Sequence, residues 1–149
     1  MGPKKQVILS NYKNLGFDRR ASLRLAVLSL GNYGRLLSEF ALLGFISKNR
    51  ILNWGIKNEG QFKQAYDSGK GIVFATFHFG NWDLAGSSLG LRGYPLAVIA
   101  DPVGPPWLNM RVIRSREANG MQVIPTRLAP PLIEKALQGG KAVAFLVDR

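Results

Sequence analysis

Along most of the chain, short apolar runs alternate with longer stretches in which apolar residues recur three and four positions apart. Runs that are rich in β-branched and aromatic residues and bounded by glycine or proline predict buried strands, whereas the longer spacing predicts helices. Strands that alternate with helices are typical of an α/β domain, in which helices flank a mostly parallel sheet in αβα layers. The expected strands span residues 72–77, 94–100, 121–124 and 141–147, and the expected helices span residues 61–68, 81–93, 107–119 and 131–138.

The first third of the chain carries a longer apolar segment, residues 23–46, whose apolar positions follow helical spacing. Its longest charge-free stretch, residues 25–34, is well short of the ~20 residues that span a bilayer. We therefore expect a helix that lies against the sheet or along a membrane interface, and different faces could do both. The chain is accordingly divided into a basic, apolar, helical region over residues 1–57 and an α/β core over residues 58–149.

Composition narrows the possible chemistry. The chain has 149 residues, of which 46% are hydrophobic, so a single domain with a real core is expected. It has no cysteine, which excludes disulfides, thiolate metal sites and a cysteine nucleophile, and a single histidine argues against a transition-metal site. The net charge is +11, and residues 1–57 hold ten basic but only two acidic residues. Such a surface attracts nucleic acid, anionic lipid headgroups or an acidic carrier protein.

The single histidine, His78, directly follows the apolar run of residues 72–77. Asn81 is a favoured helix N-cap, so Asp83 falls in the first turn of the next helix. This strand, turn and helix would place both side chains at the carboxyl edge of the sheet, where open α/β sheets build their sites. His78 could then act as a general base that Asp83 orients. The alternative is a structural histidine beside an aspartate that the helix dipole favours.

The string HFGNWD, residues 78–83, resembles the H-x-x-x-x-D motif of the lysophospholipid acyltransferase superfamily, and especially its form in bacterial lipid A biosynthesis acyltransferases. Two further segments, RSREANGMQVIP (residues 114–125) and LIEKALQGGKAVAFLVDR (residues 132–149), are similar to later parts of that family. The final VDR looks like the mycobacterial phosphatidylinositol mannoside acyltransferase branch. Full members are about twice as long, so the resemblance implies a fragment whose sheet is incomplete at the C-terminus.

This resemblance implies transfer of a fatty acyl chain from a thioester, acyl-CoA or acyl carrier protein, to a hydroxyl of a glycolipid or phospholipid. His78 would be the base and Asp83 its orienter, and the backbone at Gly80 and Asn81 would bind the oxyanion. No cofactor, metal or nucleic acid is implied. The expected location is the cytoplasmic face of a bacterial inner membrane, as a peripheral protein on an anionic surface. Further candidates for substrate or phosphate binding are Arg114, Arg116, Glu117, Arg127, Asp148 and Arg149.

Two rival functions come from other classes. The segment Gly86-Ser87-Ser88-Leu89-Gly90 matches the G-x-S-x-G elbow of serine esterases. That elbow needs a strand directly before it and a histidine later in the chain, yet Ser88 falls in a helical pattern and His78 precedes it. The other rival is a basic nucleic-acid-binding domain, which the charge favours but no recognisable motif supports.

Overall fold

The computed structural model describes residues 3–148 and contains two compact units, Met1–Phe40 and Ala41–Arg149. This division lies earlier in the chain than the boundary after residue 57 that the charge pattern suggested.

The first unit consists of two helices, α1 (Pro3–Asn14) and α2 (Arg19–Leu42), the second of which ends just inside the next unit. Asp18 caps α2, because its Oδ1 accepts a hydrogen bond of 2.7 Å from the backbone N–H of Ala21. Large apolar side chains of both helices are exposed, including Val7 of α1 at 59% and Val27 of α2 at 68%. Within residues 3–148, no helix is both long enough and apolar enough to cross a bilayer.

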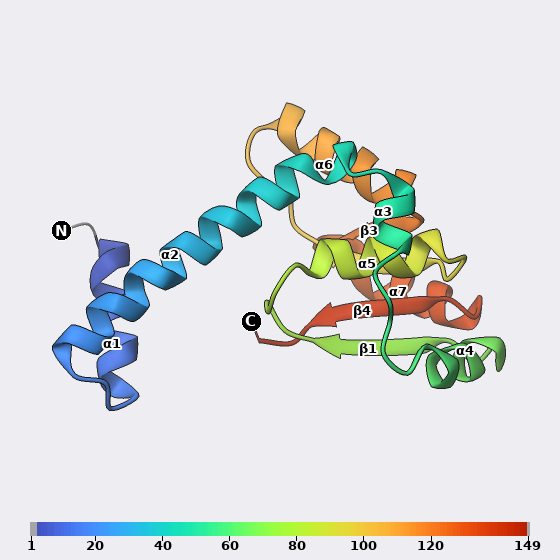
Figure 1. The fold of residues 1–149 in the computed structure, drawn as a ribbon. Helices are drawn as coiled ribbons and strands as arrows, with labels where there is room; N and C mark the ends of the chain where they lie inside the picture. Colours follow the sequence, from blue (N-terminus) through green and yellow to red (C-terminus); the bar gives the residue numbers. More distant parts are fainter. Residues whose placement is uncertain (1–2, 149) are drawn as a thin grey trace. The chain divides into compact units, whose positions relative to one another are not determined.

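The second unit is an α/β domain with a four-stranded, fully parallel sheet in the order β1-β4-β2-β3 (Figure 1). Its strands are β1 (Ile72–Thr76), β2 (Leu96–Ala100), β3 (Met121–Pro125) and β4 (Ala142–Leu146). Its helices are α3 (Lys48–Leu52), α4 (Glu59–Asp67), α5 (Trp82–Leu91), α6 (Pro106–Ala118) and α7 (Ala129–Gln138), with short 3₁₀ turns η1 (Leu43–Phe45) and η2 (Thr126–Leu128).

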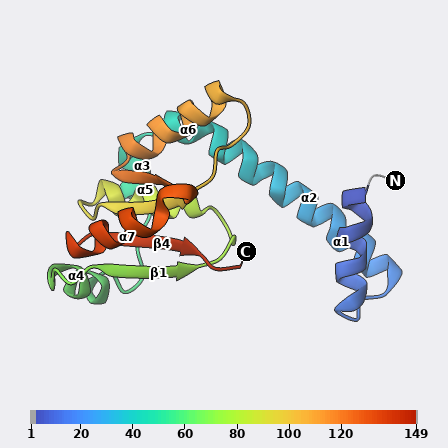
Figure 2. The ribbon, with the colours of Figure 1, turned by 180° about the vertical axis from the view of Figure 1, so that it is seen from behind.

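Apolar side chains form a core on each face of this sheet. On one face, Ala97, Ile124 and Val143 pack against Ala136 of α7. Their strand neighbours Leu96, Met121 and Ala142 point to the opposite face, since side chains alternate along a strand. Helix α5 lies in front of the sheet in Figure 1, and α7 lies in front of it in Figure 2, which shows the molecule from behind. The two helices therefore cover opposite faces of the sheet. The expected α/β class with helices flanking a parallel sheet is confirmed.

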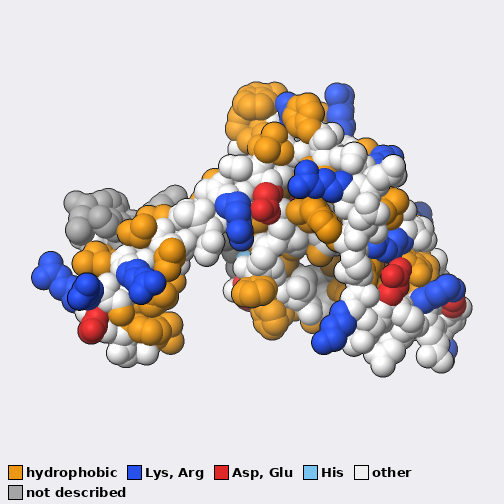
Figure 3. All heavy atoms as spheres, in the orientation of Figure 1, with side chains coloured by type: hydrophobic (Ala, Val, Ile, Leu, Met, Phe, Trp, Pro, Cys, Tyr) orange, Lys and Arg blue, Asp and Glu red, His pale blue; other side chains and the backbone are white. Residues whose placement is uncertain are grey.

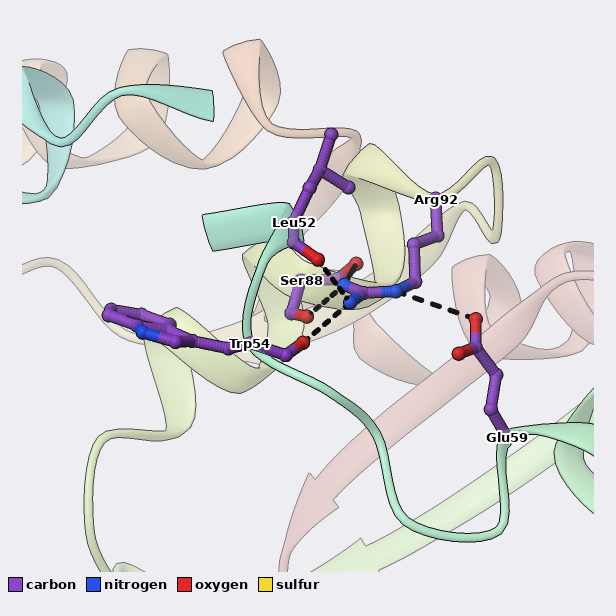
Figure 4. A network of polar contacts seen from close by, with 5 residues as sticks. All are labelled: Leu52, Trp54, Glu59, Ser88 and Arg92. Atoms are coloured by element: carbon purple, nitrogen blue, oxygen red, sulfur yellow. Dashed lines mark hydrogen bonds and ion pairs between the residues drawn. The ribbon is translucent and has the colours of Figure 1, made fainter. Parts of the chain in front are cut away.

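Arg92 fixes the long connection between α3 and α4 to the end of α5 (Figure 4). Its guanidinium donates hydrogen bonds of 2.8 Å to the carbonyl of Leu52 and 2.5 Å to that of Trp54. The same guanidinium donates a hydrogen bond of 3.0 Å to the carbonyl of Ser88 and also contacts the Ser88 hydroxyl. Its Nε forms an ion pair with the Glu59 carboxylate at 3.4 Å. One side chain therefore satisfies the last carbonyl of α3 and a carbonyl of the irregular connection that follows it.

Candidate active site

The neighbouring strands β1 and β4 bring His78 and Asp148 together. Their parallel register pairs Ile72 with Ala142 and Thr76 with Leu146. His78 and Asp148 each lie two residues beyond the paired strand ends, and their separation of 70 positions equals the register offset. The pairing continues past the strands, because the backbone N–H of Val147 donates to the carbonyl of Thr76 at 2.8 Å. The sheet therefore sets these two side chains opposite each other.

One carboxylate holds His78 at two points. Asp148 Oδ1 lies 2.8 Å from His78 Nδ1, and Oδ2 accepts a 3.0 Å hydrogen bond from the His78 backbone N–H. The side-chain hydrogen bond from His78, followed by the backbone one, lowers the pKa of Asp148 below its ordinary value of 3.8. An ionised carboxylate can only accept, so Nδ1 must carry the proton in this contact. In the neutral imidazole, Nε2 then keeps the lone pair that a general base needs.

Asp83 has a different partner from the one its spacing predicted. Its side chain is 4% exposed and accepts two hydrogen bonds from Arg116, at 2.7 Å from Nε and 3.1 Å from Nη2. The expected contact with His78 is therefore corrected, because α6 delivers a guanidinium to the buried face of α5. The same pairing corrects the expectation for Arg116, since this 7% exposed residue is committed to Asp83 rather than open to a phosphate.

The turn between β1 and α5 follows the expected design. Gly80 has φ of 62°, a backbone conformation that favours glycine, and the Asn81 side chain caps α5 by accepting a 3.0 Å hydrogen bond from the Leu84 N–H. In the first residue of α5, the Trp82 ring meets the His78 ring edge to face, with centroids 4.8 Å apart. Trp82 thus restrains the imidazole from a second side. The role of Gly80 and Asn81 at an oxyanion stays a prediction.

The remaining candidates do not gather around His78 in one cluster. Arg114 and Glu117 are exposed on α6, and Arg127 is exposed in η2. Arg149 lies outside the described residues. Ser88 of the esterase alternative is 6% exposed inside α5, where its hydroxyl contacts Arg92, so it is not at a strand-to-helix elbow. Among residues 3–148, no three carboxylate or imidazole side chains lie close enough to hold a metal ion.

From the sequence, Asp148 is predicted only as a candidate for substrate or phosphate binding, and its pairing with His78 is not predicted. The signal that could have identified it is positional: both residues follow apolar strands by the same short interval. Using that signal requires the strand order, which places β4 rather than β2 beside β1.

A parallel α/β sheet with a paired imidazole and carboxylate at the carboxyl ends of its strands is typical of an enzyme that uses a general base. The chain belongs to the bacterial lipid A biosynthesis acyltransferase family, whose model matches residues 18–149.

Among curated proteins, the chain is similar to the phosphatidylinositol mannoside acyltransferase of Mycobacterium tuberculosis. The two are 30% identical over 128 residues, which is 81% of this chain and 40% of the relative. The protein of the same name from Mycolicibacterium smegmatis is 39% identical over 89 residues, covering 57% of this chain and 29% of the relative. The chain thus spans at most about two fifths of the length of these relatives.

Proposed function

We propose that this protein transfers a fatty acyl chain from a thioester donor to a hydroxyl of a glycolipid or phospholipid at a membrane. The observation that carries the proposal is the His78–Asp148 pair at the carboxyl edge of the sheet, in a chain of an acyltransferase family. The names of the mycobacterial relatives favour a glycolipid acceptor. Either acyl-CoA or acyl carrier protein would serve as co-substrate, without a cofactor.

In this mechanism the acceptor hydroxyl attacks the thioester carbonyl while His78 Nε2 takes its proton. Asp148 holds Nδ1–H and stabilises the imidazolium that forms. The tetrahedral intermediate then expels the thiolate as the C–S bond breaks, and the imidazolium returns the proton to the sulfur. Backbone N–H groups at Gly80 and Asn81, beside the start of α5, would stabilise the oxyanion.

The surroundings of the pair suit an apolar substrate. Phe77 and Phe79, on either side of His78, are 59% and 87% exposed, and Val147 beside Asp148 is 51% exposed. Large apolar side chains this open normally mark a binding surface. An acyl chain that covered them would be stabilised by leaving water, while its thioester carbon remained near the imidazole.

Basic and apolar residues of the first unit favour action at a membrane surface. Residues 1–40 hold seven Lys and Arg residues against Asp18 and Glu39, a net charge of +5, and large apolar side chains such as Val7, Leu15 and Val27 are exposed there. A helix pair of this composition can lie in the interface, where anionic headgroups attract its Lys and Arg side chains. We propose peripheral binding at the cytoplasmic face of a bacterial inner membrane.

The test is transfer of a labelled acyl group from acyl-CoA, or from acyl carrier protein, to lipids extracted from bacterial membranes. The intact enzyme should label a glycolipid or phospholipid, and His78→Ala should lower the rate by about 10²–10⁴-fold or more. Lys135→Ala, an exposed position on α7, serves as the matched control and should retain the rate. Transfer that survives in His78→Ala would exclude His78 as the base.

A further inference from the structure

The outward face of α6 carries large apolar side chains that the fold leaves uncovered. Trp107 in its first turn is 68% exposed and Met110 is 49% exposed, while Phe45 of η1 is 71% exposed. The Arg111 guanidinium lies over the Phe45 ring, 5.0 Å from its centroid, which connects η1 to this face. We call these residues, together with the exposed Arg114, the α6 patch.

The α6 patch has no evident role in packing the described domain. The opposite face of α6 packs against the domain, because Val112 and Arg116 are each only 7% exposed and Arg116 binds Asp83. Trp107, Arg111 and Arg114 are spaced four and three apart, so they share one stripe on the other side of the helix. Leaving a tryptophan and a phenylalanine in water is unfavourable, and such a surface normally marks an interaction site.

The charges of the patch identify the kind of partner. The charged residues of the α6 patch are Arg111 and Arg114, both basic. The exposed acidic residue of α6, Glu117, comes only in the last turn of the helix. Figure 3 shows basic and hydrophobic side chains side by side over this part of the domain. Tryptophan beside arginine is typical of the membrane–water interface, where the indole sits at headgroup level and the guanidinium meets phosphate.

The position of the patch relates it to the candidate active site. Helix α6 begins soon after β2 ends, so its first turn lies at the carboxyl edge of the sheet. His78 and Asp148 follow β1 and β4 at the same edge. A membrane that contacts Trp107 would therefore face the edge of the sheet that carries His78.

We propose that the α6 patch docks the α/β domain onto an anionic lipid surface and directs the His78 edge toward it. This inference deepens the proposed function, on which it rests, and it is independent of α1 and α2. An acidic carrier protein would also meet Arg111 and Arg114, but three large exposed apolar side chains favour the apolar boundary of a bilayer.

The test uses tryptophan emission, because the chain has only three tryptophans and α1 and α2 contain none. In Trp54→Phe/Trp82→Phe, Trp107 is the single reporter, and in Trp82→Phe/Trp107→Phe the reporter is Trp54. Both full-length variants are mixed with vesicles of phosphatidylcholine and phosphatidylglycerol, with and without brominated acyl chains. We expect a blue shift and bromine quenching for Trp107 but little quenching for Trp54.

A charge variant tests the same surface without changing a tryptophan. Arg114→Glu should lower the partition coefficient for anionic vesicles by about fivefold or more. Lys135→Glu on α7 changes the net charge equally and should have a much smaller effect. These measurements require no catalysis, so they can succeed or fail separately from the acyl-transfer assay.

Three results would overturn the docking proposal. One is unquenched Trp107 in chains that sediment with the vesicles, which would assign binding to α1 and α2 alone. Another is equal loss of binding in the two charge variants. The third is a Trp107 shift with acyl carrier protein but not with vesicles, which would make the patch a protein-docking surface.

Discussion

Two aspartates near the turn after β1 differ in their partners, and the partners define their roles. Asp148 is partly open to solvent, with 35% of its side chain exposed, and it binds the His78 ring and backbone. Asp83 is buried and binds a guanidinium through both oxygens. A carboxylate at an imidazole can orient a proton acceptor, whereas a carboxylate saturated by arginine can mainly hold two helices in place.

The pKa of Asp148 provides a test of the contact with His78. Because the pKa is lowered from 3.8, the contact stabilises the fold above that pH. Its contribution is lost as the pH falls through the folded-state pKa. In a carboxyl ¹³C NMR titration, we expect the pKa of Asp148 to rise toward 3.8 in His78→Ala and to stay low in Lys135→Ala. An unchanged pKa in His78→Ala would contradict the assigned pair.

The buried pair that Asp83 forms with Arg116 should matter for the stability of the fold. Asp83→Asn leaves the Arg116 guanidinium buried without its carboxylate, and breaking such a buried pair typically costs about 3–5 kcal/mol of unfolding free energy. Asp67→Asn breaks the exposed pair with Lys63 and should cost about 0–1 kcal/mol. Urea denaturation followed by circular dichroism compares the two variants. Equal stabilities would mean that the Asp83–Arg116 pair does not hold α5 to α6.

At the scale of elements, α5 fits closely against the turn between α6 and β3. A Cβ on Gly90 would lie 2.1 Å from the carbonyl oxygen of Asn119, and a Cβ on Gly120 would lie 2.7 Å from the Gly90 oxygen. Nearby, Asn119 donates a 3.2 Å hydrogen bond to the Ser87 hydroxyl. Two glycines therefore let the end of α5 touch the turn between α6 and β3, which helps bring Arg116 to Asp83.

Substitution of Gly90 tests this close approach. Gly90→Ala should lower the unfolding free energy by about 1–3 kcal/mol or more, because the methyl group meets backbone that cannot yield. Gly60→Ala in α4 is the matched control, since nothing lies within 4 Å of its Cβ position, and it should be neutral or raise stability by up to about 1 kcal/mol. Thermal melts of both variants suffice, and similar melting temperatures would refute the packing.

The elements themselves follow closely from sequence pattern. Apolar runs with flanking glycines predict all four strands to within about two residues, and the Asn81 cap sets the start of α5 correctly. Helices α1 and α3 escape prediction because α1 has little apolar periodicity and α3 spans only five residues. Local patterns of this kind need several turns to show a period, and α3 is too short for one although it buries Ile51 completely.

At the scale of the whole molecule, the order of the strands in the sheet determines which side chains meet at the site. No local sequence pattern encodes that order. The crossovers place β4 between β1 and β2, so Asp148, seventy residues away, reaches His78 although Asp83 is only five residues away. The sequence therefore predicts the edge of the sheet and the imidazole. It does not predict which carboxylate meets the imidazole, because that depends on long-range strand pairing.

The division into two units also belongs to this scale. Residues 41–57 belong to the α/β unit, where α3 packs on α5 and Arg92 anchors the connection that follows. The excess of positive charge in residues 1–57 suggested a later boundary, because charge is a surface property and does not follow the limits of a core. The membrane-facing role of this region stays a prediction.

The most direct test of the His78–Asp148 site is the turnover number of Asp148→Asn in the intact enzyme, measured at saturating acyl donor and acceptor. Asparagine keeps the shape of the side chain but removes the charge that stabilises the imidazolium. We expect kcat to fall by about 10²–10⁴-fold with KM little changed, while the control Asp67→Asn retains both constants. A wild-type kcat in folded Asp148→Asn would show that this carboxylate does not serve the base.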